Sequence, residues 1–308
     1  MKVKLLLIGT LVLLLAACTP LSAAPTSSPE MVLTDGLGRQ VTFEGPAQRI
    51  VSLAPSITEI LFSIGAGGQV VGRDEFSDYP PEVKDVASVG GSMGDYTLEA
   101  IAALEPDLIL AAEINTPEQV KSMQDLGLRV YYLKNPVTLE GMFDQLILVG
   151  SMVGREDEAA ALKEDLVDRV QVARELAANA PEKPLVFYEL DGSDPAKPWT
   201  AGQNTFIDTL ITEAGGINIG GVLDGAYAQI SQEEILLQNP DIILLGDSAY
   251  GVTPEQVSAR PGWDSIKAVK LAHVYPFDDN LVSRPAPRLV DGLEQLVLLL
   301  HPEVELQQ

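Results

Sequence analysis

Residues 97 to 111, TLEAIAALEPDLILA, and residues 231 to 245, SQEEILLQNPDIILL, are two similar stretches of one 308-residue chain. Each opens on a hydroxyl residue, places a glutamate two positions later and passes through a Pro-Asp pair into an apolar run. The two glutamates are Glu99 and Glu233, at equivalent positions 134 residues apart. This repeat predicts two similar lobes, each with a helix that leads into a buried strand.

The rest of the chain alternates apolar runs with segments of helical periodicity. In the first half, this pattern predicts strands at 50–54, 108–111 and 129–133 and helices at 97–104, 117–126 and 138–153. It also predicts a helix after the first strand, capped by Ser56 or Thr58. In the second half, it predicts strands at 184–190, 241–245 and 273–277, and helices at 205–214, 231–238 and 287–300. Strands that alternate with helices indicate parallel sheets covered on both faces.

Residues 156–179 join the two halves. Ala159, Leu166 and Val170 belong to one apolar stripe, and the opposite face is charged. The stretch contains no Gly or Pro, so we expect one helix roughly 35 Å long. It is either a stiff spacer between two lobes or an ordinary packing helix of one domain.

The N-terminus has the layout of a secretory signal. Two lysines precede an uncharged apolar run and the small residues of LAAC, in which Cys18 is the only cysteine of the chain. LAAC resembles the lipobox of bacterial lipoproteins, which implies a signal at 1–17, lipidation of Cys18 and an extracytoplasmic location on the membrane. The alternative is a plain signal peptide or short anchor helix with an incidental cysteine. Residues 18–30 are rich in Pro, Ser and Ala and read as a flexible tether.

Composition narrows the possible partners. The chain is 46% hydrophobic, which is enough for two domains with sizeable cores. Its formal net charge of −24 repels phosphate backbones, so we expect no nucleic-acid partner. No second apolar run is long enough to span a bilayer.

Two rival chemistries find little support. GGSMG at 90–94 matches the pattern of a serine hydrolase with Ser92 as nucleophile, but helix signals begin only at Thr97. The two histidines, His273 and His301, lie 28 residues apart, and we expect the first in a strand and the second on the surface. We therefore expect neither a catalytic site nor a metal site.

Seven stretches resemble, in the family's order, the periplasmic substrate-binding proteins of importers for vitamin B12, ferric siderophores and haem. They are RIVSLAPSITEILFSIGAG (49–67), VVGRDEFSDYPPEV (70–83), VGG (89–91), TLEAIAALEPDLILA (97–111), FIDTLITEAGGIN (206–218), ISQEEILLQNPDIILL (230–245) and LVSRPAPRLVDGLEQL (281–296). The first two look most like the cobalamin-binding branch. The resemblance covers nearly all of residues 48–303 and implies an α/β fold of two Rossmann-like lobes with parallel sheets, joined by a single long rigid helix. The expected division is an N-terminal lobe at 31–153, a linking helix at 154–182 and a C-terminal lobe at 183–308.

The resemblance also implies a non-enzymatic protein, a monomer that holds a small-molecule ligand between its lobes. The implied ligand contacts are Ser56, Phe76, Met93, Tyr96, Trp199, Tyr227, Asn280, Leu281, Val282, Ser283 and Arg284. The implied ligand is a corrinoid, with ferric siderophore and haem as alternatives, and Tyr96 lies in the region that supplies an axial haem ligand. Met93 stands where the family places a tryptophan. No cofactor is implied.

The same family docks onto an ABC permease dimer through one surface acid on each lobe. The matching residues here are Glu99 and Glu233, which explains why the repeat carries a glutamate in both copies. A glutamate in the first turn of a helix is also favoured by the helix dipole, so helix stability is the alternative explanation.

Overall fold

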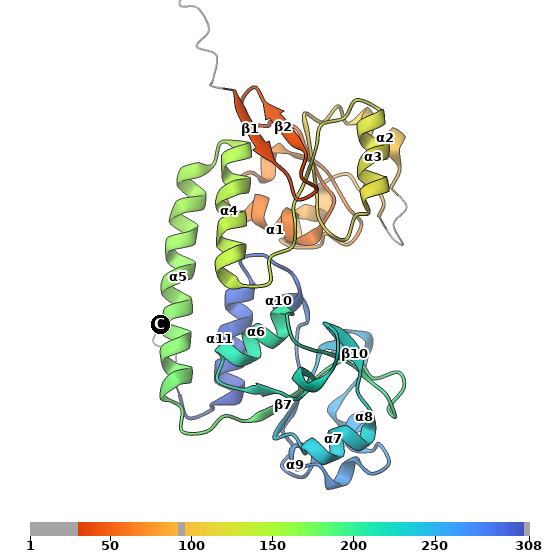
Figure 1. Ribbon diagram of the computed structural model, residues 1–308, viewed down its shortest axis with the longest axis vertical. Coiled ribbons are helices and arrows are strands. Elements are labelled where there is room, and N and C mark those ends of the chain that lie inside the picture. Colours follow the sequence, from red (N-terminus) through yellow and green to blue (C-terminus); the bar gives the residue numbers. More distant parts are fainter. Residues whose placement is uncertain (1–29, 92–95, 305–308) are drawn as a thin grey trace, which may run out of the picture.

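The structure is a computed structural model that describes residues 30–91 and 96–304. The predictions at Cys18, Ser92 and Met93, the signal and most of the tether lie outside these residues. Two α/β lobes are stacked along the long axis of the molecule, and one long helix runs beside both of them (Figure 1).

The first lobe is built on a four-stranded parallel sheet in the order β4-β3-β5-β6. Its strands are β3 (Ile50–Ser52), β4 (Val70–Arg73), β5 (Leu108–Ala111) and β6 (Val130–Tyr132). Side chains of β5 alternate between two cores, with Leu108 and Leu110 in one and Ile109 and Ala111 in the other. Both faces of this sheet are therefore covered, as predicted for parallel strands.

Helices α1 (Pro55–Ser63) and α4 (Leu139–Val153) contribute to one of these cores, and α2 (Leu98–Ala103) and α3 (Pro117–Asp125) to the other. A hairpin of β1 (Met31–Thr34) and β2 (Gln40–Phe43) forms a separate two-stranded sheet. The expected Ser56 or Thr58 cap of α1 is wrong. Pro55 takes the first helical position, where its missing N–H costs nothing, so the cap residue is Ala54.

The second lobe has a mixed sheet in the order β10-β8-β7-β11-β12, with β9 also beside β7. Its strands are β7 (Leu185–Asp191), β8 (Trp199–Ala201), β9 (Ile217–Asn218), β10 (Tyr227–Gln229), β11 (Ile242–Leu245) and β12 (Val274–Pro276). Strands β7, β11 and β12 are parallel as predicted, and β9, which was not predicted, pairs parallel with β7. Strand β8 pairs antiparallel with β7, and β10 pairs antiparallel with β8. The connection at 192–198 is too short for a parallel crossover, so β8 must fold back onto β7.

The helices of the second lobe are α6 (Phe206–Glu213), α7 (Gln232–Gln238), α8 (Pro254–Ser258), α9 (Lys267–Lys270), α10 (Asn280–Ser283) and α11 (Leu289–Leu300). His301, expected on the surface, is buried at the end of α11, and its Nε2 lies 2.9 Å from the carbonyl oxygen of Ala214. His273 precedes β12 rather than lying inside it.

Helix α5 (Glu156–Asn179) has the predicted range and packs against α4 of the first lobe and α11 of the second. Its buried residues include Ala159, Leu166 and Val170 of the predicted stripe. Within the described part of the chain, no helix combines the length and apolar character needed to cross a membrane.

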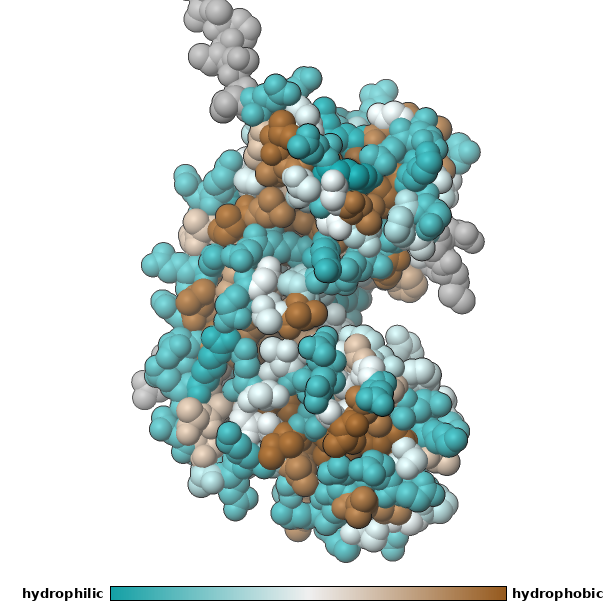
Figure 2. Space-filling model, viewed as in Figure 1, coloured by the Kyte–Doolittle hydropathy of each residue, from teal (hydrophilic) through white to brown (hydrophobic). Residues whose placement is uncertain are grey.

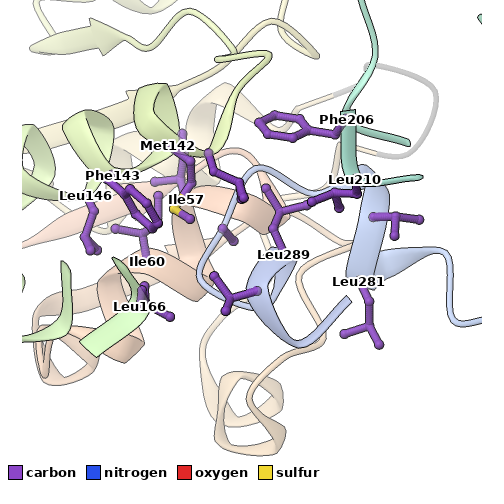
Figure 3. Close-up of a cluster of buried hydrophobic side chains, with 14 of the residues drawn as sticks. Ile57, Ile60, Met142, Phe143, Leu146, Leu166, Phe206, Leu210, Leu281 and Leu289 are labelled. Carbon is purple, nitrogen blue, oxygen red and sulfur yellow. The ribbon is translucent and has the colours of Figure 1, made fainter. Parts of the chain in front are cut away.

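The two lobes share one hydrophobic core where they meet. Figure 3 shows Ile57 and Met142 of the first lobe in the same cluster as Leu210 and Leu289 of the second. Leu166 places α5 in this cluster as well. The lobes are therefore joined by packed side chains in addition to the helix.

Candidate functional site

The carboxyl ends of the parallel strands of both lobes point toward the space between them. Arg284, which follows β12, donates from Nη1 to Oδ1 of Asp78, which follows β4, over 2.7 Å. Figure 2 shows the surface hollowed between the lobes, on the side away from α5. In open α/β sheets, ligands bind beyond the carboxyl ends of the strands, so this cleft is the candidate site.

One wall of the cleft comes from the loop after β4. The buried carboxylate of Asp74 accepts hydrogen bonds from the hydroxyl of Ser77 and, over 2.9 Å, from the backbone N–H of Phe76. Burial raises the pKa of Asp74, although both hydrogen bonds act in the opposite direction. This tight turn leaves the ring of Phe76 50% exposed. Ser56, by contrast, is buried within the first turn of α1.

Tyr96 is held by two hydrogen bonds at its hydroxyl. Oη donates to the carbonyl oxygen of Leu53 over 3.2 Å and accepts from Nδ2 of Asn115 over 2.6 Å. Burial raises the pKa of Tyr96 to about 12, and the negative charge of Asp74 acts in the same direction. The side chain is therefore a neutral phenol at physiological pH, held at its hydroxyl by Leu53 and Asn115.

The opposite wall contains an aromatic pair on the antiparallel strands of the second lobe. Trp199 of β8 lies opposite Gln229, and Tyr227 of β10 lies opposite Ala201, so the two aromatic residues are diagonal neighbours on one face. Their exposed fractions are 42% and 55%. Burial raises the pKa of Tyr227, and so does the negative charge of Asp279.

The segment Asn280–Arg284 contributes less to the cleft than the sequence implied. Leu281 and Val282 are buried, and Leu281 belongs to the core shared by the lobes (Figure 3), so these side chains are not available to a ligand. A short helix buries two successive residues here because α10 packs against both α6 and α11. Asn280 donates from Nδ2 to Asp278 over 2.9 Å, and Ser283 donates from Oγ to the carbonyl oxygen of Asp279 over 2.8 Å.

Arg284 and Arg288 of the second lobe are both paired with a buried acid of the first lobe. Glu59 of α1 accepts at Oε1 from Arg284 over 3.1 Å, and it accepts from Nε and Nη2 of Arg288 over 2.8 and 2.6 Å. Burial alone would lower the pKa of Arg288, but the hydrogen bonds and charge of Glu59 raise it. The guanidinium of Arg288 also lies 3.9 Å from the ring centre of Tyr79.

The sequence reasoning missed this cluster, which we call the Glu59 cluster: Glu59, Asp78, Tyr79, Arg284 and Arg288. One signal was available, because Glu59 interrupts the apolar run ITEILFSI at a position that faces the core. A charge on the buried face of a helix requires a partner.

Glu99 and Glu233 lie in the first turns of α2 and α7, and both are exposed. Each of these helices lies on the side of its lobe away from α5 (Figure 1). Both carboxylates are therefore accessible at the surface. Among residues 30–91 and 96–304, no three His, Cys, Asp or Glu side chains are arranged to hold a metal ion.

Comparisons with known proteins agree with this architecture. Residues 50–281 match the family model described as periplasmic binding protein. A Bacillus subtilis protein named as an uncharacterized ABC transporter substrate-binding lipoprotein is 32% identical over 89% of this chain and 86% of its own length.

Two solved structures are similar in fold. The periplasmic vitamin B12-binding protein of Vibrio cholerae superposes with a TM-score of 0.71 at 28% identity, over 83% of this chain and 97% of that one. The periplasmic haem-binding protein of Roseiflexus superposes with a TM-score of 0.75 at 27% identity, over 83% of this chain and 98% of that one.

Proposed function

Since the chain belongs to the periplasmic binding protein family, we propose that its ligand is a corrinoid, captured in the cleft between the lobes. Proteins of this family bind a small molecule outside the cytoplasm and deliver it to the permease of an ABC importer. The proposed contacts are Phe76, Trp199 and Tyr227, with Asn280 and Ser283 at the rim. The role as a binding protein for transport follows from the family, and the identity of the ligand as a corrinoid is our proposal.

The chemistry of the cleft carries this choice of ligand. It offers exposed aromatic faces on both walls, while Arg284 and Arg288 are already paired with Glu59 and Asp78. A corrin ring with neutral amide side chains matches such a surface, since each aromatic ring offers about 150–250 Å² of contact area. Haem propionates and ferric catecholates are anionic, and they favour cleft arginines without acidic partners.

Haem is the second candidate because haem-binding proteins are among the similar structures. Tyr96 is the side chain that could coordinate its iron. Its hydroxyl donates to the carbonyl oxygen of Leu53 and accepts from Asn115, and ligation as a phenolate would break the first of these hydrogen bonds. These contacts favour a positioning role for Tyr96 over ligation.

Calorimetric titration of the purified protein with cyanocobalamin, haemin and a ferric catecholate tests the proposal. We expect cyanocobalamin to bind most tightly, and Trp199→Ala to weaken it roughly tenfold to a hundredfold. The control is Trp263→Phe, because Trp263 is fully buried in the second-lobe core and should affect the melting temperature alone. Tighter binding of haemin or of the catecholate would contradict the corrinoid assignment.

We also propose that the mature protein is a monomer, held on the outer face of the cell membrane by a lipid attached to Cys18. The proposed domains are the first lobe at 31–153, the linking helix at 154–182 and the second lobe at 183–308. The LAAC sequence supports the anchor, and the Bacillus subtilis relative is named a lipoprotein.

A further inference from the structure

The Glu59 cluster connects the two lobes by ion pairs. Glu59 is 3% exposed and comes from the first lobe, whereas Arg284 and Arg288 come from the second, 225 and 229 residues further along the chain. Asp78 adds a second acid from the first lobe, so two carboxylates face two guanidinium groups. The cluster is therefore a balanced set of charges that exists only while the lobes keep their present arrangement.

Two members of the cluster also adjoin residues that we assign to ligand contact. Asp78 lies two residues after Phe76, and Arg284 directly follows Ser283. Phe76 belongs to the wall from the first lobe and Ser283 to the rim from the second. Any rotation that separates Glu59 from the arginines thus changes the distance between the aromatic walls.

Burial makes such a separation costly. The free energy lost when two charges leave water is offset only if they pair with good geometry. Removal of one partner therefore leaves the other charge buried without compensation. Here the geometry is bidentate between Arg288 and Glu59, and Tyr79 covers the Arg288 guanidinium. A surface ion pair would not have this effect, because water would solvate the released charges.

We propose that Glu59 is a positioning residue for ligand capture: by holding Arg284 and Arg288, it fixes the angle between the lobes and thereby the width of the cleft before ligand arrives. This assigns Arg284 to the lobe interface instead of the direct ligand contact implied by the sequence. The inference rests on the proposed function only in that the captured ligand is the corrinoid. The lobe angle is a property of the protein without ligand.

The test measures lobe separation and ligand affinity in the same variants. Spin labels at Leu126→Cys in the first lobe and Leu271→Cys in the second, both at exposed positions, report the distance distribution in a Cys18→Ser background. We expect Glu59→Gln to broaden this distribution without ligand and to weaken cyanocobalamin binding about tenfold. Asp78→Asn, at an exposed residue, should fold normally. Because it removes a partner from the largely buried Arg284, it should cause a smaller broadening in the same direction.

The matched control is Glu189→Gln. Glu189 is as buried as Glu59 and pairs with Arg260 at 2.5 and 2.8 Å, but both residues belong to the second lobe. Glu189→Gln should lower the melting temperature but leave the distance distribution and the affinity for cyanocobalamin unchanged. A wild-type distance distribution in Glu59→Gln would overturn the inference. If Glu59→Gln does not fold, a wild-type distribution in Asp78→Asn would do the same. Equal broadening in Glu189→Gln would also overturn it. If wild-type protein fails to bind cyanocobalamin, the corrinoid assignment fails, while the distance measurements still decide the role of Glu59.

Discussion

Tyr96 connects the chemistry of the cleft to a measurable pH dependence. In an unfolded chain a tyrosine ionises near pH 10, but burial keeps Tyr96 protonated in the folded protein up to a pKa of about 12. Between these values the folded state binds more protons, so the free energy of unfolding falls as pH rises through this window. Below pH 10 both states are protonated and the phenol adds no pH dependence.

We expect Tyr96→Phe to lose stability less steeply than wild type between pH 10 and 12, by at most one proton per molecule. Urea unfolding at several pH values measures this slope. Other buried tyrosines, such as Tyr188, keep some slope in the variant. The control is Tyr250→Phe, because Tyr250 is 90% exposed and water solvates its hydroxyl in both states. An unchanged slope in Tyr96→Phe would mean that burial does not raise the pKa of Tyr96 in the folded protein.

Single residues of the site differ in how far the sequence could predict them. Phe76, Trp199 and Tyr227 are exposed aromatics beside the cleft, which agrees with their predicted positions, although their contact with ligand stays a prediction. Leu281 and Val282 were expected to contact the ligand, but their side chains are buried. Resemblance of a sequence segment to a family does not tell which side chains of a short helix face the core. The Glu59 cluster requires residues more than 200 positions apart, a pairing that no local pattern contains.

At the scale of elements, α5 is the feature best predicted and the one with the clearest mechanical consequence. Arg174 in this helix donates to Glu140 of the first lobe over 2.9 Å and to Glu213 of the second over 2.8 Å. A continuous helix without Gly or Pro has no hinge. We therefore expect X-ray scattering curves with and without cyanocobalamin to be nearly superimposable.

Val167→Pro tests the role of this helix. Val167 lies near the middle of α5 and is 42% exposed, so the change breaks the helix, at about 3 kcal/mol, without creating a core cavity. We expect a lower melting temperature and a larger contraction on ligand binding than in the control Val167→Ala. A strong contraction of the wild type would refute the rigid helix, and identical scattering of the two variants would assign the rigidity to the shared core.

Elements with strong periodicity were predicted to within a residue or two, but short ones were not. α3 and α4 follow Thr116 and Thr138, whose side chains accept hydrogen bonds from the first turn, and such caps are visible in sequence. Strands β8 and β10 have only three residues each, so local pattern does not specify them, and they form by pairing, β8 with β7 and β10 with β8. The antiparallel part of the second sheet therefore follows from tertiary pairing and not from local pattern.

For the whole molecule, one prediction concerns the proposed lipid anchor at Cys18. Cys18 is the only cysteine in the chain, so no other thiol can take its place as lipid acceptor. Cys18→Ser should release the protein from the membrane fraction or leave an uncleaved precursor. Fractionation followed by mass determination of the product distinguishes the two. Anchoring of a processed Cys18→Ser protein would contradict lipidation at this residue.

The proposed docking partner of the two lobes is a permease with two halves. Glu99 and Glu233 are exposed at the starts of α2 and α7, and both helices lie on the side of the molecule away from α5 (Figure 1). A permease dimer that presents one arginine from each half could contact both carboxylates at once. A helix-start role would require neither the shared side nor the exposure, but it would explain the sequence position equally well.

Charge reversal separates these two roles. Replacing either glutamate by arginine sets like charges together at the permease and should cost several kcal/mol of docking free energy, so corrinoid uptake by cells should fall steeply, and most in the double variant. Loss of a favourable helix-dipole interaction costs only about 0.3–1 kcal/mol per site, so the melting temperature should change little. Ligand affinity should also persist, because both acids lie outside the cleft. The control is Asp157→Arg in the first turn of α5, an equal change of charge at a helix start on the opposite side of the molecule. Normal uptake in the double variant, or equal loss in the control, would mean that the repeated glutamates serve their helices and not a permease.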